Sequence, residues 1–160
     1  RIFDFCTPIV YASSNYVRSY QKALGMKNFS FNFVSPNSKI LHKRVNLISC
    51  WKEDVQLNLG KETDQGGAYA LKSLTSVVSA LKNGDLDAIV TAPINKHNIQ
   101  SDKFNFPGHT EYLAREFGVE EALMFMVADS LRIGVVETCF NLCDQVTLIK
   151  YIWDNAIITS

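Results

Sequence analysis

The stretch from residue 67 to residue 93 constrains the fold of this 160-residue chain more than any other. Residues 67–82 carry apolar side chains at helical spacing, which would share one helix face: Ala68, Leu71, Leu74, Val77, Val78 and Leu81. The turn sequence Asn-Gly-Asp follows, and then the apolar run LDAIVTAP at 86–93, which is typical of a strand buried on both faces of a parallel sheet. A helix, a tight turn and a buried strand in this order form half of a crossover unit, so the sequence predicts an α/β fold.

Further elements are predicted on both sides of this unit. Short apolar or alternating runs predict strands at residues 8–12, 29–35, 44–49, 55–60, 122–128 and 131–137. Helical spacing of apolar residues predicts three more helices. The first begins near Ser13 or Ser14 and ends at Gly25, the second covers 108–117, and the third covers 146–157. No repeat, low-complexity tract or linker divides the sequence, so we expect residues 1–160 to form a single unit.

Composition excludes several classes of function. Basic and acidic residues number 16 each, which gives a net charge of +0 and no basic excess for nucleic acid or membrane surfaces. No apolar segment approaches the roughly 20 residues of a membrane-spanning helix, and no signal-peptide pattern opens the sequence. The cysteines are scattered without a CxxC pair, which favours reduced thiols in a cytoplasmic protein: Cys6, Cys50, Cys139 and Cys143.

Both ends of the sequence are unusual for a complete domain. The first residue is not Met, and RIFDFC leads at once into a predicted strand. The last residues stop inside an apolar helical pattern that has no capping signal. We therefore expect a partial α/β unit, truncated at both ends, from the interior of a longer protein.

Polar residues that could bind a ligand or take part in catalysis follow the predicted strands. Ligands of open α/β sheets bind beyond the carboxyl ends of the strands, where TAPINKHNIQ, FNFPGHTEYL and ETCFNLCD would converge. His109 and Thr110 begin the helix over 108–117, where free backbone N–H groups and the helix dipole favour a phosphate or a carboxylate. The structural alternative is that Thr110 only caps this helix and His109 only bonds a backbone carbonyl. Lys96 could pair with a substrate anion, although a solvated loop lysine is the commoner case.

Cys139 and Cys143 form the last candidate pair. Their spacing could offer two thiolates from one helical turn, but zinc prefers four ligands. Two small buried side chains are the simpler interpretation of this spacing.

The segment DAIVTAPINKHNIQSDKFNFPGHTEYLAREFG, residues 87–118, resembles the 4-hydroxythreonine-4-phosphate dehydrogenase family of vitamin B6 biosynthesis. That family carries a strand ending in Thr-Gly/Ala-Pro, a lysine three residues after the proline, and later Phe-x-Gly-His-Thr-Glu. The matching positions here are Thr91, Ala92, Pro93, Lys96, Phe106, Gly108, His109, Thr110 and Glu111. The resemblance spans most of the chain and is strongest over residues 87–138.

The resemblance implies a fold similar to isocitrate and isopropylmalate dehydrogenases, a three-layer sheet with helices on both faces, of which this chain is only part. It implies a cytoplasmic homodimer that uses NAD or NADP and a divalent metal such as zinc, magnesium or cobalt. The implied reaction oxidises 4-phosphohydroxy-L-threonine to a β-keto acid, which loses carbon dioxide to give an amino-ketone phosphate. In the family the His-Thr pair contacts the substrate, so His109 and Thr110 inherit that role, and Lys96 is a possible substrate-cleft residue.

One departure from the family concerns the metal. The family has a metal-binding histidine in a pattern like Thr-His-x-Pro-Leu, where this sequence has ETCFNL, so Cys139 takes the histidine position. A thiolate can bind zinc, although it differs from imidazole in charge and softness. The family's other metal-binding histidines and most nucleotide contacts have no counterpart in these residues. We therefore expect that these residues do not form a complete metal site and that they are inactive as an isolated fragment.

Two alternatives stay open from the sequence. The chain could come from a non-catalytic paralogue that keeps the fold, or from a relative that acts on another phosphorylated hydroxy acid. The residues that would separate these alternatives are not among the 160, so the catalytic and cofactor-binding residues stay unassigned.

Overall fold

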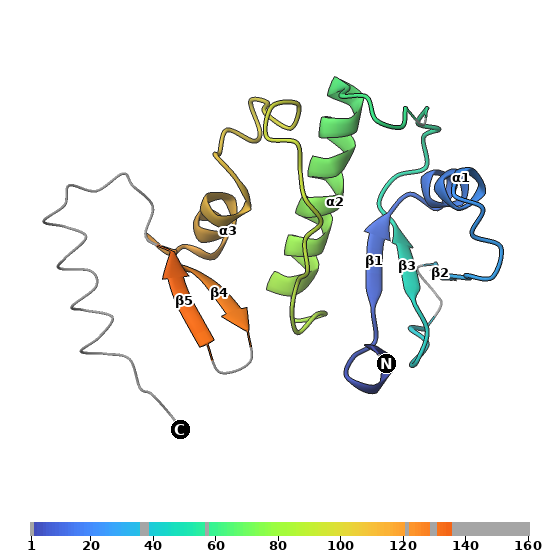
Figure 1. The fold of residues 1–160 in the computed structure, drawn as a ribbon, viewed down its shortest axis with the longest axis horizontal. Coiled ribbons are helices and arrows are strands. Elements are labelled where there is room, and N and C mark those ends of the chain that lie inside the picture. The colour runs from blue at the N-terminus through green and yellow to red at the C-terminus, as the bar shows by residue number, and fades with distance from the viewer. Residues whose placement is uncertain (1, 36–38, 57, 121, 129–130, 136–160) are drawn as a thin grey trace, which may run out of the picture.

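The computed structural model describes residues 2–35, 39–56, 58–120, 122–128 and 131–135 (Figure 1). After a short 3-10 helix, η1 (Ile2–Asp4), three parallel strands form a sheet in the order β1–β3–β2. The strands are β1 (Ile9–Ala12), β2 (Asn32–Val34) and β3 (Asn46–Ser49), as predicted within 8–12, 29–35 and 44–49. In the central strand, Leu47 pairs with Val10 on one side and Phe33 on the other, and is buried.

Side-chain caps fix the first two helices. α1 (Ser14–Ala23) begins where the Oγ of Ser13 accepts a hydrogen bond from the N–H of Tyr16, and it packs against β3. α2 (Asp64–Lys82) begins three residues before the predicted helix at 67–82, because the Oγ1 of Thr63 accepts from the N–H of Gly66 at 3.1 Å. The N–H donors of its first turn are thereby partly satisfied, and the helix extends back through the Gly-Gly pair.

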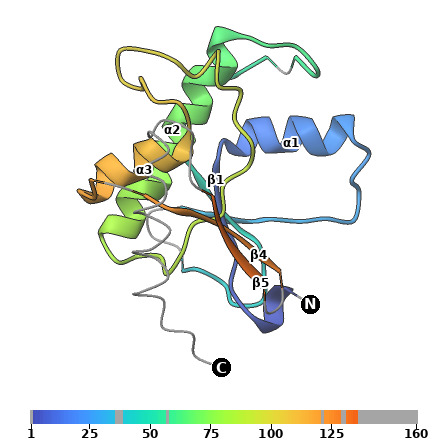
Figure 2. The same cartoon turned by 60° about the vertical axis from the view of Figure 1, so that its left-hand side comes forward.

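The main core lies between α2 and α3 (His109–Phe117), which Figure 2 shows crossing each other. The buried residues of this core are Leu74, Val78, Ile99, Phe104 and Tyr112. The aromatic rings of Phe104 and Tyr112 lie 5.2 Å apart, and Lys82 joins Glu116 across the two helices at 2.6 Å. α2 also packs against β1, where the hydroxyl of Ser73 donates to the backbone oxygen of Tyr11.

The prediction of a strand at residues 86–93 was wrong for the described part of the chain. This segment runs along α2, but no backbone group of residues 86–94 hydrogen-bonds to the backbone of another described residue (Figure 1). An apolar pattern favours an extended buried segment, but a strand also requires a neighbour with a matching row of N–H and C=O groups. Residues 55, 56 and 58–60 likewise form no strand, against the prediction for 55–60.

The last described elements form an antiparallel hairpin. β4 (Met124–Ala128) pairs with β5 (Leu131–Val135) in a register that places Met124 opposite Val135. These strands confirm the predictions at 122–128 and 131–137 as far as residue 135. The predicted helix at 146–157 lies outside the described residues, as do Cys139 and Cys143.

The described part is thus a mixed α/β structure with a parallel sheet. Within it, none of the helices combines the length and the apolar character that a membrane crossing needs.

Candidate functional site

The first half of the candidate site is the turn that carries Lys96. The side-chain oxygen of Asn95 accepts hydrogen bonds from the N–H groups of His97, at 2.8 Å, and Asn98, at 3.2 Å. This arrangement is an Asx turn, in which an asparagine side chain takes the place of a backbone carbonyl. Three residues after Lys96, Ile99 is only 2% exposed and belongs to the core. Lys96 is therefore held between a closed turn and a buried anchor.

This turn is docked on the first turn of α2. The side-chain amide of Asn98 donates to the backbone oxygen of Thr63 at 2.9 Å. A Cβ atom on Gly67 would lie 1.8 Å from the backbone oxygen of Asn98, so a glycine is required there for the two segments to approach this closely. His97 lies on the outside, with its Nδ1 3.0 Å from a carboxylate oxygen of Glu62.

The second half of the site is the N-terminus of α3. Gly108 is the N-cap residue and no side chain caps this helix, so the N–H groups of its first turn have no capping partner. Neither His109 nor Thr110 has a side-chain hydrogen-bond partner among the residues that the structure describes. The structural alternative, a Thr110 cap and a His109 bond to a backbone carbonyl, is therefore wrong within that part of the chain.

The structure brings these two halves together. A Cβ placed on Gly108 would lie 3.5 Å from a carboxylate oxygen of Glu111, 3.8 Å from the Cε of Lys96 and 3.9 Å from its Nζ. The ammonium group thus lies beside the residue that caps α3, next to His109 and Thr110 in the chain. The corner therefore combines the Lys96 ammonium, the His109 imidazole and N–H groups without a capping side chain, which suit an anion, with the Glu111 carboxylate, which would oppose one.

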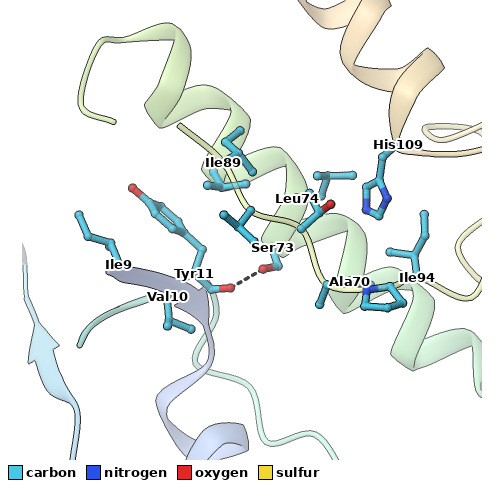
Figure 3. Close-up of a pocket in the computed structure, with 14 residues that line it drawn as sticks. Ile9, Val10, Tyr11, Ala70, Ser73, Leu74, Ile89, Ile94 and His109 are labelled. Atoms are coloured by element: carbon cyan, nitrogen blue, oxygen red, sulfur yellow. Dashed lines mark hydrogen bonds between the residues drawn. The ribbon is translucent and has the colours of Figure 1, made fainter. Parts of the chain in front are cut away.

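A cavity of about 330 Å³ opens beside this corner. Its walls are β1, α2, residues 89–94 and His109 (Figure 3). Figure 3 shows the His109 imidazole at the cavity near Leu74 and Ile94. Thr91 and Pro93 also line this cavity, so the two parts of the sequence motif meet at one place. The third stretch expected here, ETCFNLCD, lies outside the described residues.

Burial changes the protonation of His109. Partial removal from water disfavours the imidazolium and lowers the pKa of His109 from its ordinary value of 6.5. At pH 7 the ring is therefore neutral, and one nitrogen can donate while the other accepts. The formal positive charge in the corner then comes from Lys96.

Metal ligands are not gathered in the described part of the chain. No group of three or more His, Cys, Asp or Glu residues there could hold a metal ion. Cys6 and Cys50 are free thiols, and burial raises the pKa of Cys50, which keeps it protonated. Cys139 remains a prediction, because its position is not described.

Sequence reasoning missed the residues that build the corner without touching a ligand. Asn95, Asn98 and Gly67 were not singled out. The asparagine after Ile94 was a usable signal, since asparagine in a polar segment often starts an Asx turn. The need for glycine at position 67 could not be read from the sequence, because it arises from a contact with a segment about 30 residues later.

Most of the chain is similar to known proteins. Residues 4–152 match the family described as Pyridoxal phosphate biosynthetic protein PdxA. A 4-hydroxythreonine-4-phosphate dehydrogenase of Bacteroides thetaiotaomicron is 35% identical over 138 residues, covering 86% of this chain and 38% of that protein. A Clostridium botulinum protein, provisionally named a D-threonate 4-phosphate dehydrogenase, is 29% identical over 91% of this chain and 45% of its own length.

A solved structure gives the same result. The crystal structure of a 4-hydroxythreonine-4-phosphate dehydrogenase from Burkholderia phymatum superposes with a TM-score of 0.74 at 25% identity, over 91% of this chain and 44% of that one. The chain therefore spans less than half the length of these relatives. Since the family match extends over nearly all of its residues, the chain belongs to the PdxA family of pyridoxal phosphate biosynthetic proteins.

Proposed function

We propose that this chain supplies the substrate-binding corner of a dehydrogenase that acts on a phosphorylated hydroxy acid. The reaction we propose is oxidation of 4-phosphohydroxy-L-threonine, with decarboxylation to an amino-ketone phosphate. The observation that carries the proposal is the approach of Lys96 to Gly108, which directly precedes His109 and Thr110 at the start of α3, where no side chain caps the helix. His109 and Thr110 match the substrate-contacting His-Thr pair of the family, and Lys96 matches the lysine of its motif.

The corner has the chemistry that such a substrate requires. A phosphate or carboxylate oxygen placed there would accept hydrogen bonds from backbone N–H groups and from the Thr110 hydroxyl. Lys96 would supply the counter-charge. A neutral His109 can donate to a substrate oxygen, and it can also accept a proton from a substrate hydroxyl. The cavity beside His109 is lined mainly by apolar side chains.

The remaining parts of the proposal rest on the family resemblance. In the full reaction a bound NAD or NADP provides the hydride acceptor, and a divalent metal such as zinc, magnesium or cobalt provides Lewis acidity. The described residues do not offer a metal site, so such a metal would need ligands from elsewhere, with Cys139 as one candidate. A homodimer, a cytoplasmic location and a complete three-layer fold like that of isocitrate dehydrogenase belong to the same proposal.

Two alternatives are kept for specific reasons. The similarity to a protein named for D-threonate 4-phosphate makes that compound a second candidate substrate, since it is also a phosphorylated hydroxy acid. A non-catalytic paralogue is the other alternative, because cysteine replaces the family's histidine at position 139.

Turnover by the full-length protein tests the proposal. It would be assayed with each phosphorylated hydroxy acid, NAD or NADP, and a divalent metal, as wild type and as His109→Ala. We expect His109→Ala to lower kcat/KM by roughly 10- to 100-fold, as loss of one or two strong hydrogen bonds implies. The matched control is His42→Ala, because the His42 ring lies 3.2 Å from the Thr7 hydroxyl and does not line the cavity beside His109.

The two outcomes separate the alternatives. Equal kcat/KM in wild type and His109→Ala would overturn the assignment of the corner. A wild-type protein that binds the substrate but does not turn it over with any of these metals would favour the non-catalytic paralogue.

A further inference from the structure

Gln100 lies between the two halves of the corner and is bonded to both. It follows Ile99, which is buried in the core, while its own side chain is exposed. Its side-chain Nε2 donates to the backbone oxygen of Lys96 at 3.0 Å and to the backbone oxygen of Phe106 at 2.8 Å. One side chain therefore joins the Lys96 turn to the segment that leads into α3.

The chemistry of the amide fixes this arrangement. A side-chain amide nitrogen carries two N–H donors, and both partners here are carbonyl oxygens, which only accept. The nitrogen, rather than the oxygen, must therefore face these two atoms, and both of its hydrogens are used. A glutamate of the same shape would present only acceptors at neutral pH and could make neither bond.

Gln100 is also the main direct connection between the two segments. No other hydrogen bond links residues 94–98 to residues 105–110 within the described ranges. The Lys96 turn is otherwise attached to α2 through Asn98, and the second segment to the core through Phe104. The spacing between the two halves is thus set by these separate attachments and by the bridge at Gln100.

We propose that Gln100 is a positioning residue, which holds Lys96 at the distance from the first turn of α3 that a phosphorylated hydroxy acid needs. This inference rests on the proposed function of the corner. A ligand that bonds to both halves binds most tightly when they are already correctly spaced, because no ordering of the two segments then opposes binding. Gln100 itself would not touch the ligand.

The test uses the full-length protein with Gln100→Glu, assayed with 4-phosphohydroxy-L-threonine and with D-threonate 4-phosphate. We expect KM for the substrate that is turned over to rise about tenfold while kcat changes less than threefold, because ligand capture is affected more than the chemical step. The matched control is Gln21→Glu, which loses one bond of the same kind, from Nε2 to the backbone oxygen of Phe29 at 2.7 Å, between α1 and the segment before β2. That variant should keep the wild-type KM.

A double-mutant cycle distinguishes positioning from a general loss of stability. If Gln100 acts through Lys96, then Gln100→Glu should raise KM much less in a Lys96→Ala background than in the wild type. Equal effects in both backgrounds would overturn the proposal. Hydrogen exchange gives a readout that does not depend on substrate: the amides of residues 95–99 and 106–109 should exchange faster in Gln100→Glu and not in Gln21→Glu.

The proposal and the function on which it rests can fail separately. If His109→Ala lowers kcat/KM but Gln100→Glu leaves both KM and amide exchange unchanged, only the positioning role is overturned. If His109→Ala has no effect on turnover, the corner is not the substrate site, and both proposals fall together.

Discussion

Asn46 in β3 and His109 at the start of α3 use polar side chains in opposite ways. Asn46 is fully buried, and its side-chain oxygen accepts from the Asn32 side chain at 2.7 Å and from the N–H of Leu41 at 2.9 Å. Its amide nitrogen donates to the backbone oxygen of Leu41 at 3.0 Å and to that of Arg44 at 3.1 Å. His109, in contrast, has no side-chain partner within the described residues and lines a cavity.

The difference separates polar groups that hold the fold from polar groups that are available to a ligand. A buried polar side chain with all its bonds made inside the protein fixes the surrounding loops and leaves nothing for a ligand. A polar side chain beside a cavity, without a protein partner, can exchange its contact with water for a contact with a substrate. Substitutions at the first kind of site should therefore affect stability, and at the second kind, binding.

The largest expected effect on stability is at Asn46. Asn46→Ala removes the bonds between β3 and the loop before it and leaves the Asn32 side chain and backbone groups of Leu41 and Arg44 without this partner. We expect the free energy of unfolding to fall by about 3 kcal/mol, as the loss of a buried network implies. Chemical denaturation of the full-length protein would measure this, and KM should stay at the wild-type value at temperatures where the variant is folded. A large rise in KM without a loss of stability would break the comparison.

Gly67 should show an intermediate behaviour, since it supports the site through the fold. Gly67→Ala would place a Cβ 1.8 Å from the backbone oxygen of Asn98, so the Lys96 turn must move away from α2. We expect a loss of about 2 kcal/mol in the free energy of unfolding, typical of overpacking, together with a higher KM. The control is Gly66→Ala, whose added Cβ would lie 3.1 Å from the Oγ1 of Thr63, a tight contact with a side chain rather than with backbone. If both variants are equally stable, the close approach at Gly67 has no energetic importance.

The smallest expected effect is the part of the pH dependence of stability that His109 contributes. Its folded pKa lies below the unfolded value of 6.5, so the unfolded chain takes up a proton first as the pH falls. The stability from a neutral His109 is complete above pH 6.5 and decreases below it. Melting temperatures between pH 7.5 and 5.5 should fall less steeply in His109→Gln than in the wild type. Asn46 does not titrate, so in Asn46→Ala the melting temperature should change with pH as steeply as in the wild type. An identical pH dependence of the melting temperature in all three proteins would count against the lowered pKa of His109.

The sequence predicted the elements whose determinants are local. Apolar spacing and turn residues that lie close together in the chain predict the helix α2, the strands β1, β3, β4 and β5, and the start of a helix at His109. The earlier start of α2 was missed, although Thr63 is a favoured capping residue at the observed position.

Features that depend on a distant partner could not be predicted in the same way. Residues 86–93 have the pattern of a buried strand, but pairing depends on backbone groups of another segment, which the pattern does not contain. For the site, the sequence placed His109 and Thr110 at a helix start and Lys96 in a nearby loop. The contact of Lys96 with Gly108 and the bridge at Gln100 depend on how that loop folds back on α2.

The most direct test of the central claim is a calorimetric titration of the full-length protein with the two phosphorylated hydroxy acids, 4-phosphohydroxy-L-threonine and D-threonate 4-phosphate. If the corner at Lys96, His109 and Thr110 binds the substrate, His109→Ala should raise the Kd of the tighter ligand by at least about tenfold, as the loss of a strong hydrogen bond implies. Asn46→Ala, measured where it is folded, should keep the wild-type Kd. A His109→Ala protein that binds this ligand as tightly as the wild type would contradict the account.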